Sequence, residues 1–396
     1  MSWKSVALGE VANVGAGNSA PQDEKLFENG THNFYRTSDV GRIRYGVISD
    51  ALDKLNVEGV KGLRLHPKGT ILFPKSGAST FLNHRVMLEK EGYVSSHLAT
   101  IKAIPEKADD KFLLYFLSTV DAKNLVQDSN YPSLKTSVID KVIIELPPLA
   151  TQKKIVAKLD AIFAEIDKAK EAAKANVNNA EALFQSYLTQ VFELAGEEWQ
   201  TNHLGKITKF VDYRGKTPTK TDSGIRLITA KNVKFGYLNK EPYEYIAEED
   251  YVGWMTRGIP EKGDVLFTTE APLANVAQLD TDEKVVFAQR LIILQSKKDV
   301  LDSEFLKFSL LSRKVQNEII SKGTGATVKG IKASLLKLIP IDYPSLNEQR
   351  KICSKLSILE SESKKVKCIY LSKISNLSLY KKSILKKAFT GDLVKE

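Results

Sequence analysis

The chain has 396 residues, of which 42% are hydrophobic and 27% are charged, and its formal net charge at pH 7 is +10. This length predicts two or three domains, and the composition is that of a globular protein rather than a disordered one. No apolar run approaches the roughly 18 residues of a membrane span, and no signal-peptide pattern opens the chain. We therefore expect a cytoplasmic protein whose positive charge is compatible with a polyanionic partner.

Residues 1–150 are expected to form a mixed α/β domain. The runs TILF (70–73) and YVSSHLATIKAI (93–104) are rich in β-formers and are bounded by turn residues. The run KFLLYFLS (111–118) indicates a short helix that packs within the same domain.

Residues 151–196 follow Pro147–Pro148 and are predicted to form a long helix. Its apolar residues recur in alternating steps of four and three, which is the repeat of a coiled-coil seam. They are Ile155, Leu159, Ile162, Ile166, Ala169, Ala173, Ala180, Leu183 and Tyr187, with Asn176 interrupting the stripe. Gly196 is expected to end the helix.

Residues 197–346 repeat the first pattern, with DVLF (264–267), VVFAQRLIILQ (285–295) and a helix at EFLKFSLLS (304–312). The run GTGATVKG (323–330) lacks the closing Gly-Lys-Ser/Thr of a phosphate loop, so we interpret it as an ordinary loop.

A second long helix is predicted over residues 347–396, with Ser345 and Glu348 forming a capping box and Gly391 ending it. Its seam consists of Ile352, Leu356, Leu359, Val366, Tyr370, Leu377, Tyr380 and Ile384. Lys373 interrupts this seam as Asn176 interrupts the first, and the two are expected to form a polar layer that fixes the helix register.

The two halves are a tandem duplication. A shift of 197 residues aligns Ser137 with Ser334 and continues through the two helices, including Gln152 with Gln349, while a neighbouring shift aligns Trp3 with Trp199. The predicted fold is α+β, with two similar mixed α/β domains in tandem repeat joined by two long antiparallel coiled-coil helices. Two alternatives stay open: each helix packs on its own domain, or it dimerises with another chain.

Groups that would mark an enzyme are missing from the sequence. No glycine pattern of a nucleotide or methyl-donor site follows a strand and opens a helix. The five histidines and two cysteines have no metal-ligand spacing. We therefore expect no catalytic residue, no metal and no cofactor in this chain.

The duplicated runs LPPLATQKKIVAKLDAI (146–162) and YPSLNEQRKICSKLSIL (343–359) resemble the specificity subunit of type I restriction–modification systems. The runs KKSILKKAFTGDLV (381–394), QSYLTQVFELAGEEW (185–199) and DYRGKTP (212–218) are similar to further elements of that family. The chain departs from the family pattern at Thr151, where glutamate is usual, and at Tyr343–Pro344, where two prolines are usual.

This resemblance implies a DNA-recognition subunit that is not itself an enzyme. It would read a bipartite, asymmetric site in double-stranded DNA, one part with each domain, and the paired helices would set the unread spacer. It would hold two methyltransferase subunits, which carry S-adenosylmethionine and modify adenine, and two nuclease/translocase subunits in the full complex.

Two other classes of protein remain to be weighed. A methyltransferase–specificity fusion would need a catalytic domain for which this length leaves no room. A coiled-coil protein-binding adaptor without sequence-specific DNA recognition is the main alternative, although the net charge and the duplicated β-rich domains speak against it.

Candidate DNA contacts lie in turn-rich segments, where the backbone can approach the duplex. An amide such as Asn232 could bind adenine, and Arg214 or Arg290 could bind guanine; for each residue the alternative is a solvated surface group. The candidates of the second domain are Tyr213, Arg214, Lys216, Thr217, Lys220, Lys231, Asn232 and Arg290. Those of the first domain are Asn18, Ser19, Tyr35, Arg36, Thr37, Ser38, Lys75, Ser76, Asn83, Arg85, His97 and Tyr131.

Overall fold

The structure is a computed structural model that describes residues 3–126, 132–194, 196, 198–215, 217–288, 290–325, 329–391 and 393. It divides into two compact units, Met1–Ala173 with Ser372–Glu396, and Lys174–Leu371. Each unit therefore contains one α/β domain and a part of both long helices. The two units are described separately below.

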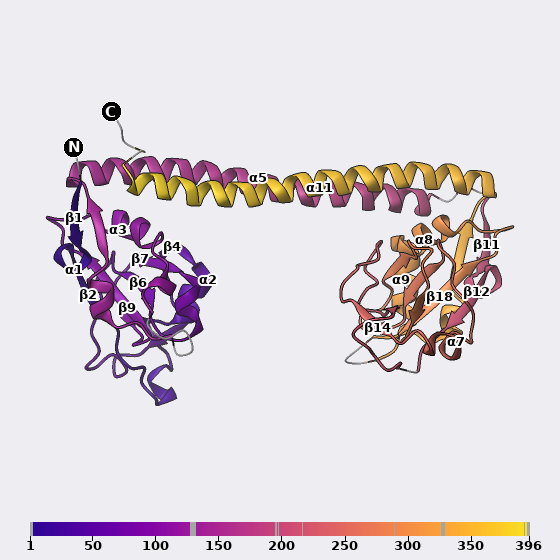
Figure 1. Cartoon of the computed structure of the whole chain (residues 1–396), viewed down its shortest axis with the longest axis horizontal. Helices are drawn as coiled ribbons and strands as arrows, with labels where there is room; N and C mark the ends of the chain where they lie inside the picture. The colour runs from indigo at the N-terminus through magenta and orange to yellow at the C-terminus, as the bar shows by residue number, and fades with distance from the viewer. Residues whose placement is uncertain are drawn as a thin grey trace. The chain divides into compact units, whose positions relative to one another are not determined.

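The domain of the first unit is built on a five-stranded sheet in the order β2-β9-β6-β7-β4 (Figure 1). A three-stranded sheet in the order β5-β3-β8 lies beside it, and β1 pairs with β10. The strands are β1 (Lys4–Ala7), β2 (Ala12–Ala16), β3 (His32–Tyr35), β4 (Tyr45–Ile48), β5 (Asp53–Leu55), β6 (Ile71–Pro74), β7 (Arg85–Leu88), β8 (Tyr93–Val94), β9 (Leu98–Ala103) and β10 (Ile143–Leu146). The helices are α1 (Leu8–Val11), α2 (Thr37–Ile43), α3 (Asp110–Leu117) and α4 (Thr136–Asp140), with short 3-10 helices η1 (Glu24–Leu26), η2 (Ala78–Leu82) and η3 (Ala122–Asn124).

The residues of β6 are apolar without a break, and the packing of this strand explains why. Side chains alternate between the two faces of a strand. Ile71 and Phe73 lie in one core, together with α3 and the first part of the long helix α5, whereas Leu72 lies in a second core on the opposite face. Both faces of the strand are therefore covered.

The domain of the second unit repeats this topology. Its main sheet has the order β12-β18-β15-β16, its smaller sheet has the order β14-β13-β17, and β11 pairs with β19. The strands are β11 (Gln200–His203), β12 (Thr208–Asp212), β13 (Ile225–Ile228), β14 (Glu244–Ile246), β15 (Val265–Thr268), β16 (Val276–Gln278), β17 (Val285–Phe287), β18 (Leu291–Ser296) and β19 (Pro340–Tyr343). The helices are α6 (Leu204–Ile207), α7 (Asp250–Trp254), α8 (Ser303–Leu311), α9 (Arg313–Lys322) and α10 (Ala333–Leu336).

The predicted duplication is confirmed in the pairing of the strands. In the smaller sheet of each domain the central strand has one antiparallel and one parallel neighbour: β3 with β5 and β8, and β13 with β14 and β17. The antiparallel ladders β2–β9–β6 and β12–β18–β15 also correspond. The first domain adds β4 and α2 to this plan, and the second adds α7 and α9.

Two long helices, α5 (Leu149–Glu193) and α11 (Leu346–Phe389), follow the two domains. At the start of α11 one arm of the expected capping box is present, because the Glu348 backbone N–H donates to Ser345 Oγ over 3.5 Å. Beyond its end, Gly391 has φ +84°, the left-handed conformation of a helix C-cap. No helix in the described part of the chain is both long and apolar enough to span a bilayer.

A buried glutamine attaches the start of each long helix to its domain. Gln152 Oε1 accepts from the backbone N–H of Asp109 over 2.9 Å, and Gln152 Nε2 donates to the carbonyls of Lys107 and Pro147. Gln349 does the same with Asp302, Val300 and Pro344. Since Asp109 and Asp302 are the N-caps of α3 and α8, each glutamine joins a long helix to the short helix beneath it.

In the first unit the beginning of α5 runs antiparallel to the end of α11. Ile155, Leu159 and Ile166 of α5 share a core with Ile384 and Ala388 of α11. Lys381 Nζ lies 2.9 Å from Asp167 Oδ2. The same core contains α3, so the helix packs on its own domain and on the other helix at once.

In the second unit the end of α5 runs antiparallel to the beginning of α11. Leu356 and Cys353 of α11 share a core with Phe184 and Leu188 of α5. Ser363 Oγ donates to the Ala180 carbonyl over 2.7 Å. The predicted antiparallel pairing is thus present within each unit.

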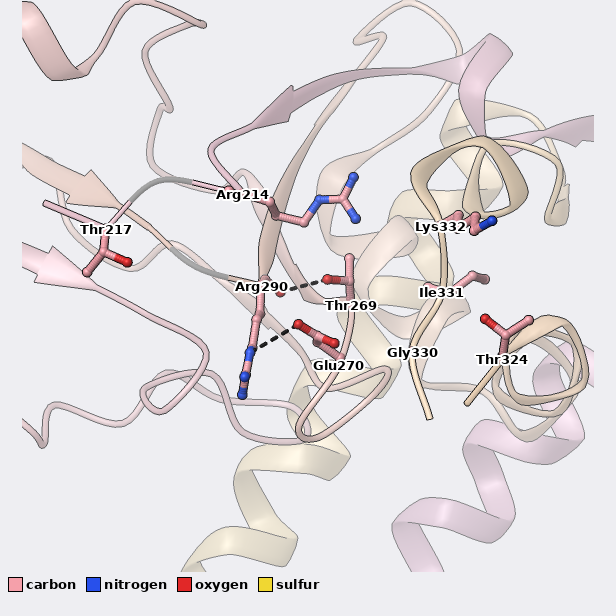
Figure 2. A pocket seen from close by; sticks show the side chains of 10 residues that line it. Arg214, Thr217, Thr269, Glu270, Arg290, Thr324, Gly330, Ile331 and Lys332 are labelled. Carbon is pink, nitrogen blue, oxygen red and sulfur yellow. Dashed lines mark hydrogen bonds and ion pairs between the residues drawn. The ribbon is translucent and has the colours of Figure 1, made fainter. Parts of the chain in front are cut away.

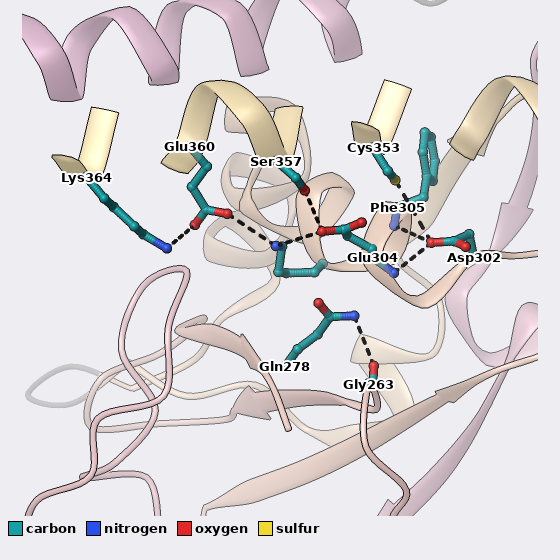
Figure 3. A network of polar contacts seen from close by, with 10 residues as sticks. Gly263, Gln278, Asp302, Glu304, Phe305, Cys353, Ser357, Glu360 and Lys364 are labelled. Carbon is teal, nitrogen blue, oxygen red and sulfur yellow. Dashed lines mark hydrogen bonds and ion pairs between the residues drawn. The ribbon is translucent and has the colours of Figure 1, made fainter. Parts of the chain in front are cut away.

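A polar network attaches α8 to α11 in the second unit (Figure 3). Lys307, whose side chain is only 7% exposed, lies 3.4 Å from Glu360 Oε2 and 3.8 Å from Glu304 Oε1. Glu360 also pairs with Lys364 over 2.7 Å, and Ser357 Oγ donates to Glu304 Oε1. At the corresponding place in the first unit, Asp160 of α5 pairs with Lys111 of α3 over 2.6 Å.

The structure corrects part of the predicted seam. Ile155, Leu159, Ile166 and Leu356 are buried, and Ile162, Ile352, Leu359, Val366 and Asn176 are half-buried. Leu183, Lys373 and Tyr380 are exposed, so their predicted places in the buried seam are wrong. The half-buried apolar residue next to Lys373 is Ile374.

Candidate nucleic-acid interface

Three segments of the second domain meet where β15 ends and β18 begins. The Thr269 N–H donates to the Arg290 carbonyl over 2.8 Å, and the Ile331 N–H donates to the Thr269 carbonyl over 2.9 Å. Glu270 forms a β-bridge with Gly330. Residues 269–270, 290 and 330–332 are called the second junction here.

The first domain has the same arrangement where β6 ends and β9 begins. The Lys75 N–H donates to the His97 carbonyl over 3.0 Å, and the Leu134 N–H donates to the Lys75 carbonyl over 2.8 Å. Ser76 forms a β-bridge with Ser133. Residues 75–76, 97 and 133–135 are called the first junction here.

The two junctions share a backbone frame and carry different side chains. Their hydrogen bonds place Lys75 opposite Thr269 in the duplication, Ser76 opposite Glu270, and His97 opposite Arg290. Next in the chain, Lys135 corresponds to Lys332, and both are exposed. The predicted residues Lys75, Ser76, His97 and Arg290, which the sequence places far apart, therefore lie at two equivalent sites.

A cavity of about 540 Å³ opens at the second junction. Figure 2 shows the residues that line it: Arg214, Gly215, Thr217, Thr269, Glu270, Arg290, Thr324, Gly330, Ile331 and Lys332. The loop after β12 supplies Arg214 and Thr217, so three predicted residues are brought together here from two distant segments. Because its lining is mostly polar and includes three cations, the cavity is suited to an anionic or hydrogen-bonding ligand.

The two arginines of the cavity are held in different ways. Arg290 Nε lies 3.1 Å from Glu270 Oε1, and the side chains of this pair are 51% and 46% exposed. Arg214 donates to Asp212 through both Nε and Nη2, over 2.8 and 2.7 Å. Partial burial would raise the pKa of Asp212, but the hydrogen bonds and the charge of Arg214 outweigh it and lower that pKa.

The backbone of Arg290 is unusual, because its φ of +64° lies in the left-handed region that side chains other than glycine seldom adopt. Its carbonyl accepts from both the N–H and the hydroxyl of Thr269, the latter over 3.2 Å. This anchoring holds the conformation, and it fixes the direction in which the arginine side chain leaves the sheet.

Other first-domain candidates lie around a second cavity, of about 570 Å³, that includes Arg36, Asp53 and Phe27 in its lining. Arg36 Nε lies 2.5 Å from Asp53 Oδ2, and its guanidinium lies 5.6 Å from the centre of the Phe27 ring. Thr37 and Ser38 open α2 beside it.

Two more first-domain candidates, Asn18 and Ser19, follow the end of β2. Ser19 is exposed, whereas Asn18 uses its Oδ1 to accept from the Arg64 N–H over 2.9 Å.

Four predicted contacts are wrong because the side chains are buried. Tyr35 and Arg85 are 0% exposed, and Tyr213 is 3% exposed. Arg85 lies over the Phe73 ring, 3.3 Å from its centre, and burial lowers its pKa to about 9. The Tyr213 hydroxyl donates to the Gly258 carbonyl over 2.7 Å and accepts from the Arg257 N–H.

Asn232 is the fourth buried candidate, also at 0% exposure. Its Oδ1 accepts from the Thr229 N–H over 3.0 Å, and its Nδ2 donates to the carbonyls of Asn239 and Pro242 over 3.2 and 3.1 Å. The amide holds a turn together and has no edge left for a base.

The remaining candidates have local roles or lie elsewhere. Asn83 joins η2 to η3, because its Nδ2 donates to Asp121 Oδ1 and its Oδ1 accepts from the Ala122 N–H, each over 2.9 Å. Lys220 and Lys231 both lie near Glu244 Oε1, at 2.7 and 3.7 Å. Tyr131 and Lys216 lie outside the described residues.

Sequence reasoning missed Thr269, Glu270 and Lys332, which complete the second junction. Thr269 and Glu270 follow the run DVLF after one intervening residue, Thr268. Lys332 lies two residues before Ser334, which matches Ser137 in the duplication. Aligning the two halves residue by residue would have placed them opposite Ser76, Lys75 and Lys135.

Among the residues that the structure describes, no group of three or more His, Cys, Asp or Glu side chains is arranged to hold a metal ion.

Comparison with protein families matches a model described as "Type I restriction modification DNA specificity domain" over residues 1–177 and again over 196–369. The Type I restriction enzyme EcoBI specificity subunit of Escherichia coli is 23% identical over 99% of this chain and 86% of its own length. The MjaVIII specificity subunit of Methanocaldococcus jannaschii is 24% identical over 70% of this chain and 69% of its own length.

Solved structures show the same fold. A chain from a structure concerned with the complex assembly and conformational transition of the type I R-M system has a TM-score of 0.79 and 19% identity, covering 99% of this chain and 98% of that one. The HsdS subunit of Thermoanaerobacter tengcongensis has a TM-score of 0.59 and 20% identity, covering 99% and 97%.

Proposed function

Because the chain belongs to the family of type I restriction modification DNA specificity domains and contains that domain twice, we propose that it reads the DNA site of a type I restriction–modification complex. Each α/β domain reads one part of a bipartite, asymmetric site in double-stranded DNA. The chain itself catalyses no step of the reaction.

One observation carries this proposal: the two junctions have the same backbone frame and different side chains. Lys75, Ser76 and His97 stand where the second domain has Thr269, Glu270 and Arg290. Hydrogen-bonding side chains on a common frame are suited to base edges in the major groove, where each base pair presents its own pattern of donors and acceptors. Different side chains at equivalent places would read different sequences, which makes the combined site asymmetric.

Partner subunits supply the chemistry in this proposal. Two methyltransferase subunits carry S-adenosylmethionine and modify adenine, and two nuclease/translocase subunits join the full complex. The relatives that support this are named specificity subunits of restriction enzymes. Apolar side chains exposed on α11 also favour protein partners, with Ile358 63%, Ile369 64% and Leu379 60% exposed.

The long helices set the spacer between the two parts of the site. Helices α5 and α11 contain 45 and 44 residues, which corresponds to roughly 65 Å at 1.5 Å per residue. A rigid connection of fixed length would hold two DNA-reading domains at one helical phase of the duplex.

The test is DNA binding by the chain purified together with its methyltransferase subunit. We expect a shifted complex with one DNA sequence class that competes poorly with unrelated DNA and weakens steeply as salt rises. A protein-binding adaptor would form the protein complex and show the same weak affinity for every duplex, and that result would contradict the proposal.

A further inference from the structure

The Nε atom and the backbone carbonyl of Arg290 have partners within the protein, whereas the terminal nitrogens of its guanidinium point outward. Glu270 binds its Nε over 3.1 Å, and Thr269 binds its carbonyl. Figure 2 shows the Glu270 carboxylate at the Nε edge of the guanidinium, with the terminal nitrogens pointing away from it. The two nitrogens that form the fork of an arginine therefore face outward on a side chain that is 51% exposed.

Arg214, the other arginine of the cavity, differs from Arg290 in this respect. Asp212 accepts from its Nε and from its Nη2, so one of the terminal nitrogens is already engaged, and the side chain is 28% exposed. Arg214 can add positive charge to the cavity, but it does not present a free fork. The cation suited to two parallel hydrogen bonds is Arg290.

We propose that Arg290 reads a guanine in the part of the DNA site that the second domain recognises, and that Glu270 is its positioning residue. The O6 and N7 atoms of guanine are acceptors on the major-groove edge, and the two terminal nitrogens of an arginine match them. This inference rests on the proposed function and adds to it the residue and the base.

The Glu270 pair explains why this arginine would discriminate between bases. A long side chain loses conformational freedom when it binds. A carboxylate on Nε reduces that loss and orients the fork before DNA arrives. The first domain has Ser76 and His97 at the equivalent places, so it lacks this arginine–carboxylate pair and would read its own part of the site by other contacts.

The test measures methylation by the chain assembled with its methyltransferase subunit on a duplex library that is randomised in the second part of the site. For Arg290→Ala we expect the preference for G·C at one position to fall on the order of 10- to 100-fold, with the other positions unchanged. Arg290→Lys should lose the same preference, because lysine keeps the charge without the fork. Since all these residues meet the same backbone strain at φ +64°, the comparison isolates the side chain.

Lys298 supplies the matched control. It follows the other end of β18 and forms an ion pair with Glu261 over 3.0 Å, with its side chain 83% exposed. Lys298→Ala removes one positive charge from the same domain and should leave the base preference at every position as it was.

Glu270 is tested separately. Glu270→Ala should weaken the preference at the same G·C position by less than Arg290→Ala does, and Glu270→Gln should restore most of it, because the amide oxygen can still accept from Nε. A purely structural role for Glu270 would lower methylation at all sequences alike and leave the preferences intact.

The outcomes separate this inference from the proposed function. If the wild-type complex methylates without sequence preference, the proposed function itself fails. If it is selective and the second part of the site contains no required G·C pair, or if Arg290→Ala and Arg290→Lys both assemble with the methyltransferase and keep every preference, then the assignment of Arg290 is overturned.

Discussion

Gln152 Oε1 lies 2.9 Å from the backbone nitrogen of Asp109, so the first turn of one of the longest helices is bonded to the N-cap of a short one. Gln349 has the same relationship to Asp302, over 2.8 Å. Both glutamine side chains are 0% exposed. The duplicated glutamine, which the sequence shows as part of a repeated motif, therefore has a structural function in each unit.

Gln152→Leu should lower the free energy of unfolding of the first unit by about 3 kcal/mol, because it removes the partner of the Asp109 N–H and of the Lys107 and Pro147 carbonyls in a region that is partly or fully buried. Hydrogen exchange followed by mass spectrometry reads the two units separately. Peptides of the first domain should lose protection, and those of the second should keep it. Gln185→Leu, at an exposed position of the same helix, is the control and should change neither.

Lys307→Ala should destabilise the second unit by about 3 kcal/mol, because it removes the buried cation between Glu304 and Glu360. The matched control is Lys365→Ala. Lys365 and Glu362 both lie on α11 and form an ion pair over 2.6 Å, with side chains 64% and 58% exposed. Loss of this exposed pair should change the free energy of unfolding by less than about 0.5 kcal/mol. Equal effects of the two variants in a urea titration would contradict the role given to Lys307.

His66 should make the first domain sensitive to acid. Burial, together with the charge of Arg64, lowers the pKa of His66 from 6.5 to about 4. Between these values the unfolded chain binds a proton that the folded chain does not, so stability rises with pH across this window and falls as pH drops from 6.5 to 4. The loss should be roughly 3 kcal/mol.

The His66 prediction is checked by unfolding at several pH values between 4 and 7. His66→Leu should flatten the pH dependence of the first domain, whatever it does to stability at pH 7. A slope that persists in His66→Leu would assign the acid sensitivity to other groups.

The strands and the duplication could be predicted because their signals are local and strong. β6 is apolar throughout and β15 is apolar except for Thr268 at its end, since both faces of each strand are buried. The short helices α3 and α8 were predicted for the same reason, because most of their residues are buried.

The helix seams were predicted less accurately because the choice between adjacent positions depends on what lies opposite. Phe184 and Leu188 are buried where Leu183 was expected, because this end of α5 packs against α8, with the Phe184 and Phe308 ring centres 6.3 Å apart. The prediction assigned Lys373 to the seam, whereas the half-buried residue is the adjacent Ile374. A straight helix drifts relative to a strict seven-residue repeat, and the burial follows Ile374.

The candidate DNA contacts show where residue type alone fails. Arg85 and Asn232 are polar residues in segments rich in turns, which favours exposure. Both are nevertheless fully buried, Arg85 against the Phe73 ring and Asn232 against the backbone of residues 239–242. Arg290 was among the candidates, but its pairing with Glu270 and its place opposite His97 depend on how two strands meet.

The most direct measurement of the central claim is the DNA motif methylated after residues 197–346 are replaced by the corresponding domain of another specificity subunit. The modified adenines are mapped across a genome in cells that supply the methyltransferase subunit. The account predicts that one part of the motif changes to that of the donor, while the other part and the requirement for two parts stay. A folded, active complex whose motif changes in both parts, or in neither, would contradict the claim that each domain reads its own part of the site.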